Sequence, residues 1–147
     1  MTPLKQRFKH DPTNGVWGDC QRAAVASIFD LALNDVPDFG DGGPSSEEFR
    51  RRIDAFMERY GLVAVSVPYN CTLEQLLEAT ALQANNVYFL LGGTSRTGVN
   101  QTVVGYNGKI IHDPSLTDAG ITGPCDDGYY WIEYFVARHP SALRLAS

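Results

Sequence analysis

Long apolar runs are missing from this chain of 147 residues. The longest, such as Val87 to Leu91, are far too short for a bilayer, which takes about 20 apolar residues to cross. The N-terminal segment from Met1 to Pro12 also has no apolar core of the kind that a secretory signal peptide carries. We therefore expect no membrane partner, and we expect the protein to be cytoplasmic.

Cysteine is scarce, and the usual metal and phosphate motifs are missing. The three residues Cys20, Cys71 and Cys125 are an odd number without the spacing of a disulfide scaffold, which indicates free thiols in a reducing compartment. The sequence has no CxxC, HExxH, GxGxxG or GxxxxGK pattern. It therefore predicts neither a metal site nor a cofactor.

Positive charge is also in short supply. Lys and Arg number 12 against 17 Asp and Glu, and the formal net charge is −5. The one basic run, residues 50–52, lies beside Glu47, Glu48 and Asp54 and is typical of a solvated helix face. Proteins that bind nucleic acids cluster their Lys and Arg residues, so we expect no nucleic-acid partner.

What is present is the ordinary composition of one globular domain. Hydrophobic residues make up 44% and charged residues 20%, and the length suits a single core, so we expect one domain over residues 1–147. Residues 1–18 are rich in turn formers and read as a loop-rich N-terminal arm. Periodicity and caps predict helices at 20 to about 33, from 45 or 46 to about 59, and after Thr72. Strands are predicted at 62–67, 87–91, 101–106, 109–112 and 129–136, with Pro68 ending the first and a loop over 92–98. Helices followed by mostly antiparallel strands indicate an α+β fold.

Cys20 is the first candidate for chemistry. It follows a Gly-Asp turn, and Asp19 is a good N-cap for the helix that starts at this cysteine. The positive end of the helix dipole and its unpaired N–H groups would stabilise a thiolate there. The alternative is a buried structural cysteine, since free cysteines are often interior.

The string NGVWGDCQRAAVASI, from Asn14 to Ile28, resembles the nucleophile segment of papain-like cysteine peptidases. It is most similar to the bacteriocin-processing type and to related bacterial or phage-encoded proteins. The resemblance implies a papain-like fold with a central N-terminal helix packed on a mostly antiparallel sheet. It also implies that Cys20 is the nucleophile and that Asn14, six residues earlier, supports the oxyanion together with the Cys20 N–H. The alternative for Asn14 is an ordinary Asn-Gly turn.

A second segment, from Asn100 to Pro114, departs from the same family at one position. In these relatives a histidine begins a strand of the form His-x-Val-Val, and the Asp of a following Asp-Pro orients that histidine. Asp113 fits the orienting position, but Gln101 stands where the resemblance places the histidine. Glutamine cannot take a proton from a thiol near neutral pH.

Three histidines could replace the missing base: His10, His112 and His139. If Asn107-Gly108 is a two-residue turn, residue 103 opposes His112, which then shares a face with Gln101. If Gly108 closes a three-residue turn with a bulge, Gln101 opposes Asp113 and His112 points to the other face. The second register fits the resemblance better and makes His112 structural. His10 and His139 are expected on the surface.

Three hypotheses about function follow from these residues. The chain is a papain-like cysteine peptidase or related thiol acyl-transferase that acts on a peptide or amide bond, with its base position replaced by Gln101. Alternatively, it is an inactive papain-like domain that binds a peptide or a host protein in the old cleft. The third hypothesis is a small structural or inhibitory protein, phage-encoded as the resemblance implies, that engages a host protein through its acidic surface.

Overall fold

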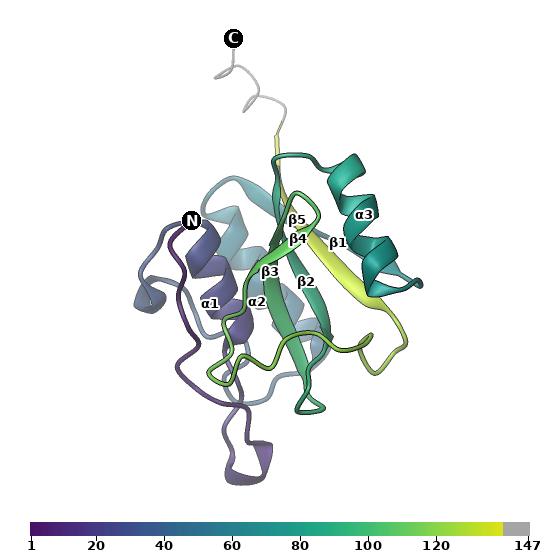
Figure 1. Ribbon diagram of the computed structural model, residues 1–147. Helices are drawn as coiled ribbons and strands as arrows, with labels where there is room; N and C mark the ends of the chain where they lie inside the picture. The colour runs from purple at the N-terminus through teal and green to yellow at the C-terminus, as the bar shows by residue number, and fades with distance from the viewer. Residues whose placement is uncertain (140–147) are drawn as a thin grey trace.

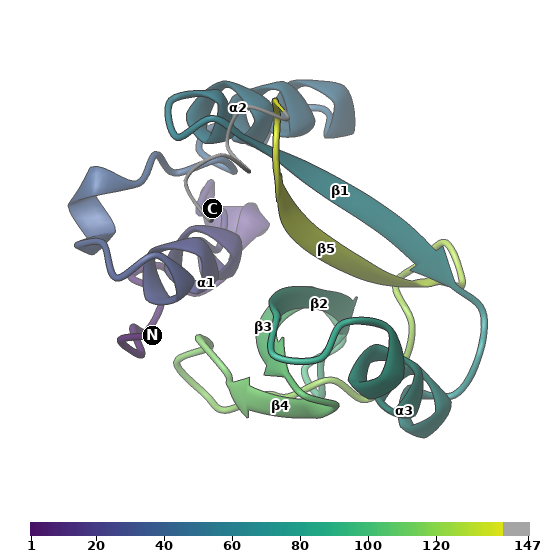
Figure 2. The same cartoon turned by 90° about the horizontal axis from the view of Figure 1, so that it is seen from above.

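Five strands form one antiparallel sheet in the computed structural model, which describes residues 1–139. Their order across the sheet is β1-β5-β2-β3-β4, and every neighbouring pair is antiparallel (Figures 1 and 2). The strands are β1 (Leu62–Tyr69), β2 (Tyr88–Thr94), β3 (Asn100–Tyr106), β4 (Lys109–His112) and β5 (Tyr130–Ala137). The last strand in sequence therefore lies between the first two, which requires the chain to return to the middle of the sheet.

Two strands run further than the sequence pattern predicts. β1 continues through Pro68 to Tyr69 because it is an edge strand, where a proline without an N–H breaks no hydrogen bond on the open side. β2 continues through Gly92 and Gly93, which pair with Thr102 and Gln101 of β3. The predicted end at Pro68 and the predicted loop from residue 92 are therefore wrong.

Three α-helices accompany this sheet within residues 1–139, and two have well-formed caps. Ser45 accepts a hydrogen bond from the Glu48 N–H at the start of α2, and Thr72 and Gln75 form a capping box at the start of α3. The helices are α1 (Cys20–Ile28), α2 (Ser46–Glu58) and α3 (Leu73–Gln83). α1 is shorter than predicted because Asp30 adopts a left-handed conformation, with φ of 54°, soon after its last turn.

The helices cover opposite faces of the sheet, as the view in Figure 2 shows. α1 and α2 pack with Leu90 and Val104 on one face, through residues such as Val25 and Phe56. On the other face, Leu76 of α3 packs among side chains that include Phe89, Leu91, Val103 and Ile132. The alternation of buried side chains along β2 and β3 gives each face its own core. The predicted α+β class is confirmed in this form, with three helices and an antiparallel sheet.

The hairpin between β3 and β4 sets the positions of Gln101 and Asp113. Tyr106 opposes Lys109, so Asn107-Gly108 is a two-residue turn, and both turn residues have positive φ, as a type I′ turn requires. An irregularity in β4 then shifts the register, so that Val104 opposes His112. The predicted three-residue turn is therefore wrong. The bulge still places His112 with Val104, on the face opposite to Gln101.

The N-terminal arm packs along α1 (Figure 1). The Thr2 N–H donates to the Ser27 carbonyl, and the Leu4 N–H donates to Ser27 Oγ. Asp19 is buried and sits at the N-cap position, but its side chain does not cap the helix. Its Oδ1 accepts the N–H groups of Arg7 and Phe8 at 2.9 and 2.8 Å. Asp19 therefore ties the arm to the start of α1.

Candidate functional site

Cys20 opens α1 and is half-buried. Burial raises the pKa of its thiol above the ordinary value, and the Asp19 carboxylate adds to this effect. Hydrogen bonding from the backbone of Thr102 and Gln21 favours the thiolate but does not outweigh burial. The helix start therefore does not leave Cys20 with the lowered pKa expected of an activated nucleophile.

Thr102 is oriented by a chain of polar side chains on the same face of the sheet. Its hydroxyl donates to Gln21 Oε1 at 2.7 Å, and Gln21 Nε2 donates to Glu133 Oε2 at 2.9 Å. Because the hydroxyl proton goes to Gln21, the Thr102 oxygen offers the thiol only lone pairs. Such a lone pair can accept a hydrogen bond from a protonated Cys20 but cannot stabilise its thiolate.

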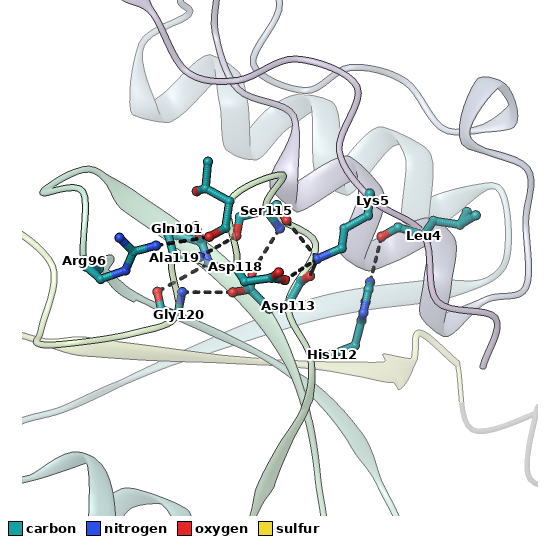
Figure 3. A network of polar contacts seen from close by, with 11 residues as sticks. Leu4, Lys5, Arg96, Gln101, His112, Asp113, Ser115, Asp118, Ala119 and Gly120 are labelled. Atoms are coloured by element: carbon teal, nitrogen blue, oxygen red, sulfur yellow. Dashed lines mark hydrogen bonds and ion pairs between the residues drawn. The ribbon is translucent and has the colours of Figure 1, made fainter.

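Gln101 and Asp113 lie side by side, as Figure 3 shows. Gln101 is buried, and its Nε2 donates to Asp113 Oδ1 at 2.8 Å. The same Asp113 Oδ1 accepts the Ser115 N–H at 2.9 Å, and Oδ2 accepts the Gly120 N–H at 2.9 Å. These bonds fix the carboxylate, so that one of its oxygens holds the amide of Gln101 in place.

Asn14 is not brought to Cys20. It ends the short 3₁₀ helix η1 (Pro12–Asn14), is exposed, and donates from Nδ2 to Asp11 Oδ2 at 2.7 Å. This helix lies in the purple loop that projects below the rest of the molecule in Figure 1. The spacing from Cys20 suggested an oxyanion position, but the structure shows the turn that was the alternative reading.

Gln6 occupies the neighbourhood of Cys20 instead. It is buried, its N–H donates to the Pro114 carbonyl at 2.8 Å, and it lines a cavity together with Cys20 and Gln101. Its Nε2 donates to the Phe8 carbonyl and lies 3.3 Å from where a Cβ on Gly18 would stand. The six-residue spacing that selected Asn14 did not indicate Gln6, because the residues of the projecting loop lie between Gln6 and Cys20 in the sequence.

The three histidines have different surroundings. His112 is half-buried and its Nε2 lies 2.6 Å from the Leu4 carbonyl, so it joins β4 to the N-terminal arm (Figure 3). His139 is exposed after the end of β5. His10, expected on the surface, is half-buried and lines two cavities with Cys20.

The tautomer of His10 bears on whether it can serve as a base. Its Nδ1 accepts the Gly18 N–H at 3.2 Å. In the neutral ring the proton then resides on Nε2, which becomes a donor with no lone pair to receive a proton. The one basic nitrogen of His10 is therefore already occupied.

Three adjoining cavities form a cleft past Cys20. Cavities of about 300 and 290 Å³ both include Cys20, Gln101 and His10 in their walls. The second also includes Trp17, and it shares Gln21, Gly92 and Thr102 with a larger cavity of about 710 Å³. Gly92 has no side chain, which leaves the floor open where the cavities meet.

The larger cavity ends at a buried carboxylate. Glu133 is 9% exposed, and burial raises its pKa above the ordinary value in spite of the Gln21 hydrogen bond and the nearby Arg50 guanidinium. Cys125 lines the same cavity, and burial, together with Asp127 and Asp126, raises its pKa to about 11. Neither residue carried a motif that sequence reasoning could have used.

Comparisons with known proteins add no relative. No protein-family model, curated protein or solved structure matches the chain. Within residues 1–139, no group of three or more His, Cys, Asp or Glu side chains is placed to hold a metal ion. None of the helices in that range has the length and apolar character needed to traverse a bilayer.

Proposed function

We propose that this protein is a papain-like domain without hydrolytic activity, which binds a peptide or protein segment in the cleft beside Cys20. The observation that carries the proposal is the 2.8 Å hydrogen bond from Gln101 Nε2 to Asp113 Oδ1. In a papain-like site the orienting carboxylate holds an imidazole in this way. Here it holds an amide, which has no pKa near neutrality and cannot accept the thiol proton.

The neighbouring groups supply no replacement for that base. Nδ1 of His10 is occupied by the Gly18 N–H, and His112 binds the arm at Leu4. Burial of the Cys20 thiol raises its pKa, so little thiolate forms at neutral pH. The cleft itself is retained, and its cavities offer a peptide both apolar walls and hydrogen-bonding groups.

Restoring the imidazole tests this proposal. In Gln101→His, the ring can donate to Asp113 and accept the thiol proton, so the pKa of Cys20 should fall and its alkylation by iodoacetamide at pH 7 should rise about tenfold or more. Site-resolved mass spectrometry measures alkylation of Cys20, with Cys71 in the same molecule as the internal reference. We expect turnover of a p-nitrophenyl ester only in this variant.

Gln101→His with Asp113→Asn is the matched control, because it keeps the imidazole and removes the charge that orients it. The gain in alkylation should be largely lost in this double variant. Rapid alkylation of Cys20 and ester turnover by the unchanged protein would contradict the proposed inactivity. An unaltered alkylation rate in Gln101→His would show that residue 101 does not face the thiol as a base would.

A further inference from the structure

The cavity of about 710 Å³ is the largest of the three along the cleft, and it adjoins a cavity that Cys20 lines. Its wall includes Gly92 and Thr102, which also line the cavity that contains Cys20. From there it extends to Glu133 on β5, on the same face of the sheet. A peptide that lies across Cys20 can therefore place a neighbouring side chain in this space, whose volume is typical of small-ligand sites.

Its charged groups are mostly acidic. Glu133 lies buried within it, while Asp126 and Asp127 are exposed, so carboxylates stand both deep in the cavity and at the solvent side. Among the described residues of this wall, all within 1–139, Arg50 is the one cation. Three carboxylates and one guanidinium give these residues a formal charge of −2.

Arg50 is already engaged by other partners. Its Nε lies 3.2 Å from Asp54 Oδ1, one Nη donates to Ser66 Oγ at 2.7 Å, and the other donates to the Ala64 carbonyl. Its contact with Glu133 Oε1 is longer, at 3.4 Å. Each oxygen of Glu133 thus has one protein partner, and a carboxylate oxygen can accept more than one donor.

The uncharged part of the wall suits the stem of a long side chain. Phe49, Ile53 and Leu90 provide apolar surface, and Trp131 stands beside the acidic residues. The Trp131 indole N–H donates to Asp127 Oδ2 at 2.8 Å, which holds ring and carboxylate together. Lysine and arginine place their methylene stems on such surfaces while their charged ends reach polar groups, and cations are attracted to the face of an indole.

We infer that this cavity, next to Cys20 and ending at Glu133, receives an arginine or lysine side chain of the bound peptide. This inference rests on the proposed function, since it names the kind of peptide that the cleft takes. The ligand's cation would pair with Glu133 in the interior and with Asp126 and Asp127 nearer to solvent. The net charge of −5 on the whole chain acts in the same direction, by attracting a basic partner over longer distances.

The two tryptophans of the chain make the experiment specific, because Trp17 lines the cavity with Cys20 and Trp131 lines the acidic cavity. The probes are the pentapeptide acetyl-Ala-Ala-Arg-Ala-Ala-amide and the same peptide with citrulline, which is close to arginine in shape but uncharged. Titrations followed by the two indole N–H signals in ¹H–¹⁵N spectra give the site and the affinity. We expect the arginine peptide to shift both signals and to bind about tenfold more tightly than the citrulline peptide, as the loss of one charge-assisted pair implies.

Substitutions in the cavity wall test whether the preference for the arginine peptide over the citrulline peptide arises there. Glu133→Gln keeps the shape of the side chain and should remove most of the difference between the peptides. Asp126→Asn, at an exposed position, should remove part of it. Glu78→Gln is the matched control, because Glu78 is exposed on α3, on the far side of the sheet, and its loss should leave the preference unchanged.

Three other results would contradict the basic subsite, the proposed inactivity or the peptide-binding function. Equal affinity for the two peptides would overturn the basic subsite while leaving peptide binding beside Cys20 in place. Cleavage of a bound arginine peptide would overturn the proposed inactivity but support the subsite. If neither peptide shifts either indole signal, both the subsite and the peptide-binding function are wrong.

Discussion

Gln101 differs from a catalytic histidine in one chemical respect that matters here. Both side chains can present an N–H to Asp113, so the hydrogen bond at 2.8 Å and the local packing do not require a base at this position. Only the imidazole has a second nitrogen able to hold a proton at neutral pH. A change of one residue can therefore abolish catalysis and leave the surrounding framework intact.

Gly105 is a residue whose identity is dictated by packing. It faces Phe89 across β2 and β3, and a Cβ on Gly105 would lie 2.1 Å from the Phe89 ring. We expect Gly105→Ala to lower the free energy of unfolding by about 1–3 kcal/mol, because the ring must move within a filled core. Urea denaturation measures the change.

Gly123→Ala is the control, since a Cβ there meets no atom within 4 Å. It should leave the free energy of unfolding nearly unchanged. The effect of Gly105→Ala should shrink in a Phe89→Leu background, because leucine has no ring to collide with the new methyl group. Additive effects of the two substitutions would argue against the collision as the cause.

Among the structural elements, the N-terminal arm is held by hydrogen bonds to α1 and to the residues around the end of β4. It pairs with no strand of the sheet within residues 1–139, and its backbone is held at α1 by Asp19 and Ser27. Asp19 also lies 3.5 Å from the Arg22 guanidinium, which is buried and donates to the Val36 carbonyl. The arm in turn brings Gln6 and His10 to the cavity with Cys20.

Asp19→Ala should release the arm from the start of α1. Two N–H groups lose their acceptor and Arg22 loses its partner carboxylate, so we expect a loss of about 2–4 kcal/mol in the free energy of unfolding. Hydrogen exchange of the Arg7 and Phe8 amides should become faster by at least about tenfold. Both are measured on the same variant, by urea denaturation and by exchange detected by NMR.

Asp30→Ala is the comparison within the same region. Asp30 is exposed and contacts Thr2 and the N-terminal amine, so its loss should change the free energy of unfolding much less than the loss of Asp19. If Asp19→Ala and Asp30→Ala had equal effects on the Arg7 and Phe8 amides, the arm would not be tied at Asp19.

At the scale of the whole molecule, Glu133 affects the pH dependence of stability in the direction opposite to that of a typical paired carboxylate. A paired carboxylate such as Glu48 beside Arg51 has a lowered pKa and stabilises the fold as the pH rises above acidic values. Burial raises the pKa of Glu133, so the folded state holds that proton more tightly than the unfolded chain. Its contribution to stability is therefore lost as the pH rises from the ordinary glutamate pKa through the raised one.

Glu133→Gln should make the protein more stable at pH 7. It removes an ionised carboxylate from a buried position, and we expect a gain of about 1 kcal/mol that shrinks as the pH falls toward about 4.5. Urea denaturation across this pH range measures the difference between the variant and the unchanged protein. A variant that is less stable at pH 7, or equally shifted at every pH, would show that the Arg50 and Gln21 contacts outweigh burial.

Such a gain would also bear on function. A buried carboxylate that lowers stability, in a cavity beside a thiol, is more readily explained by a ligand than by folding. The stability of Glu133→Gln and its loss of preference for the arginine peptide are separate measurements. Together they distinguish a binding residue from a residue that only supports the fold.

Several features of this protein follow from short stretches of its sequence. The helix that begins at Cys20, the caps at Ser45 and Thr72 and a hairpin at Asn107-Gly108 were predictable, although the turn has two residues and not the three expected. Each depends on hydrogen bonds and backbone preferences within a few residues, so local sequence is enough to specify it. The α+β class follows from the order of those elements.

Only the tertiary structure decides which residues line the cleft. Asn14 lies away from Cys20 while Gln6 and His10 line its cavity, because the arm first packs along α1 and then loops out before Cys20. Glu133 is buried near Cys20 because β5 enters the middle of the sheet. These placements depend on packing between segments far apart in the sequence, and such packing leaves no periodic or spaced pattern from which it could be read.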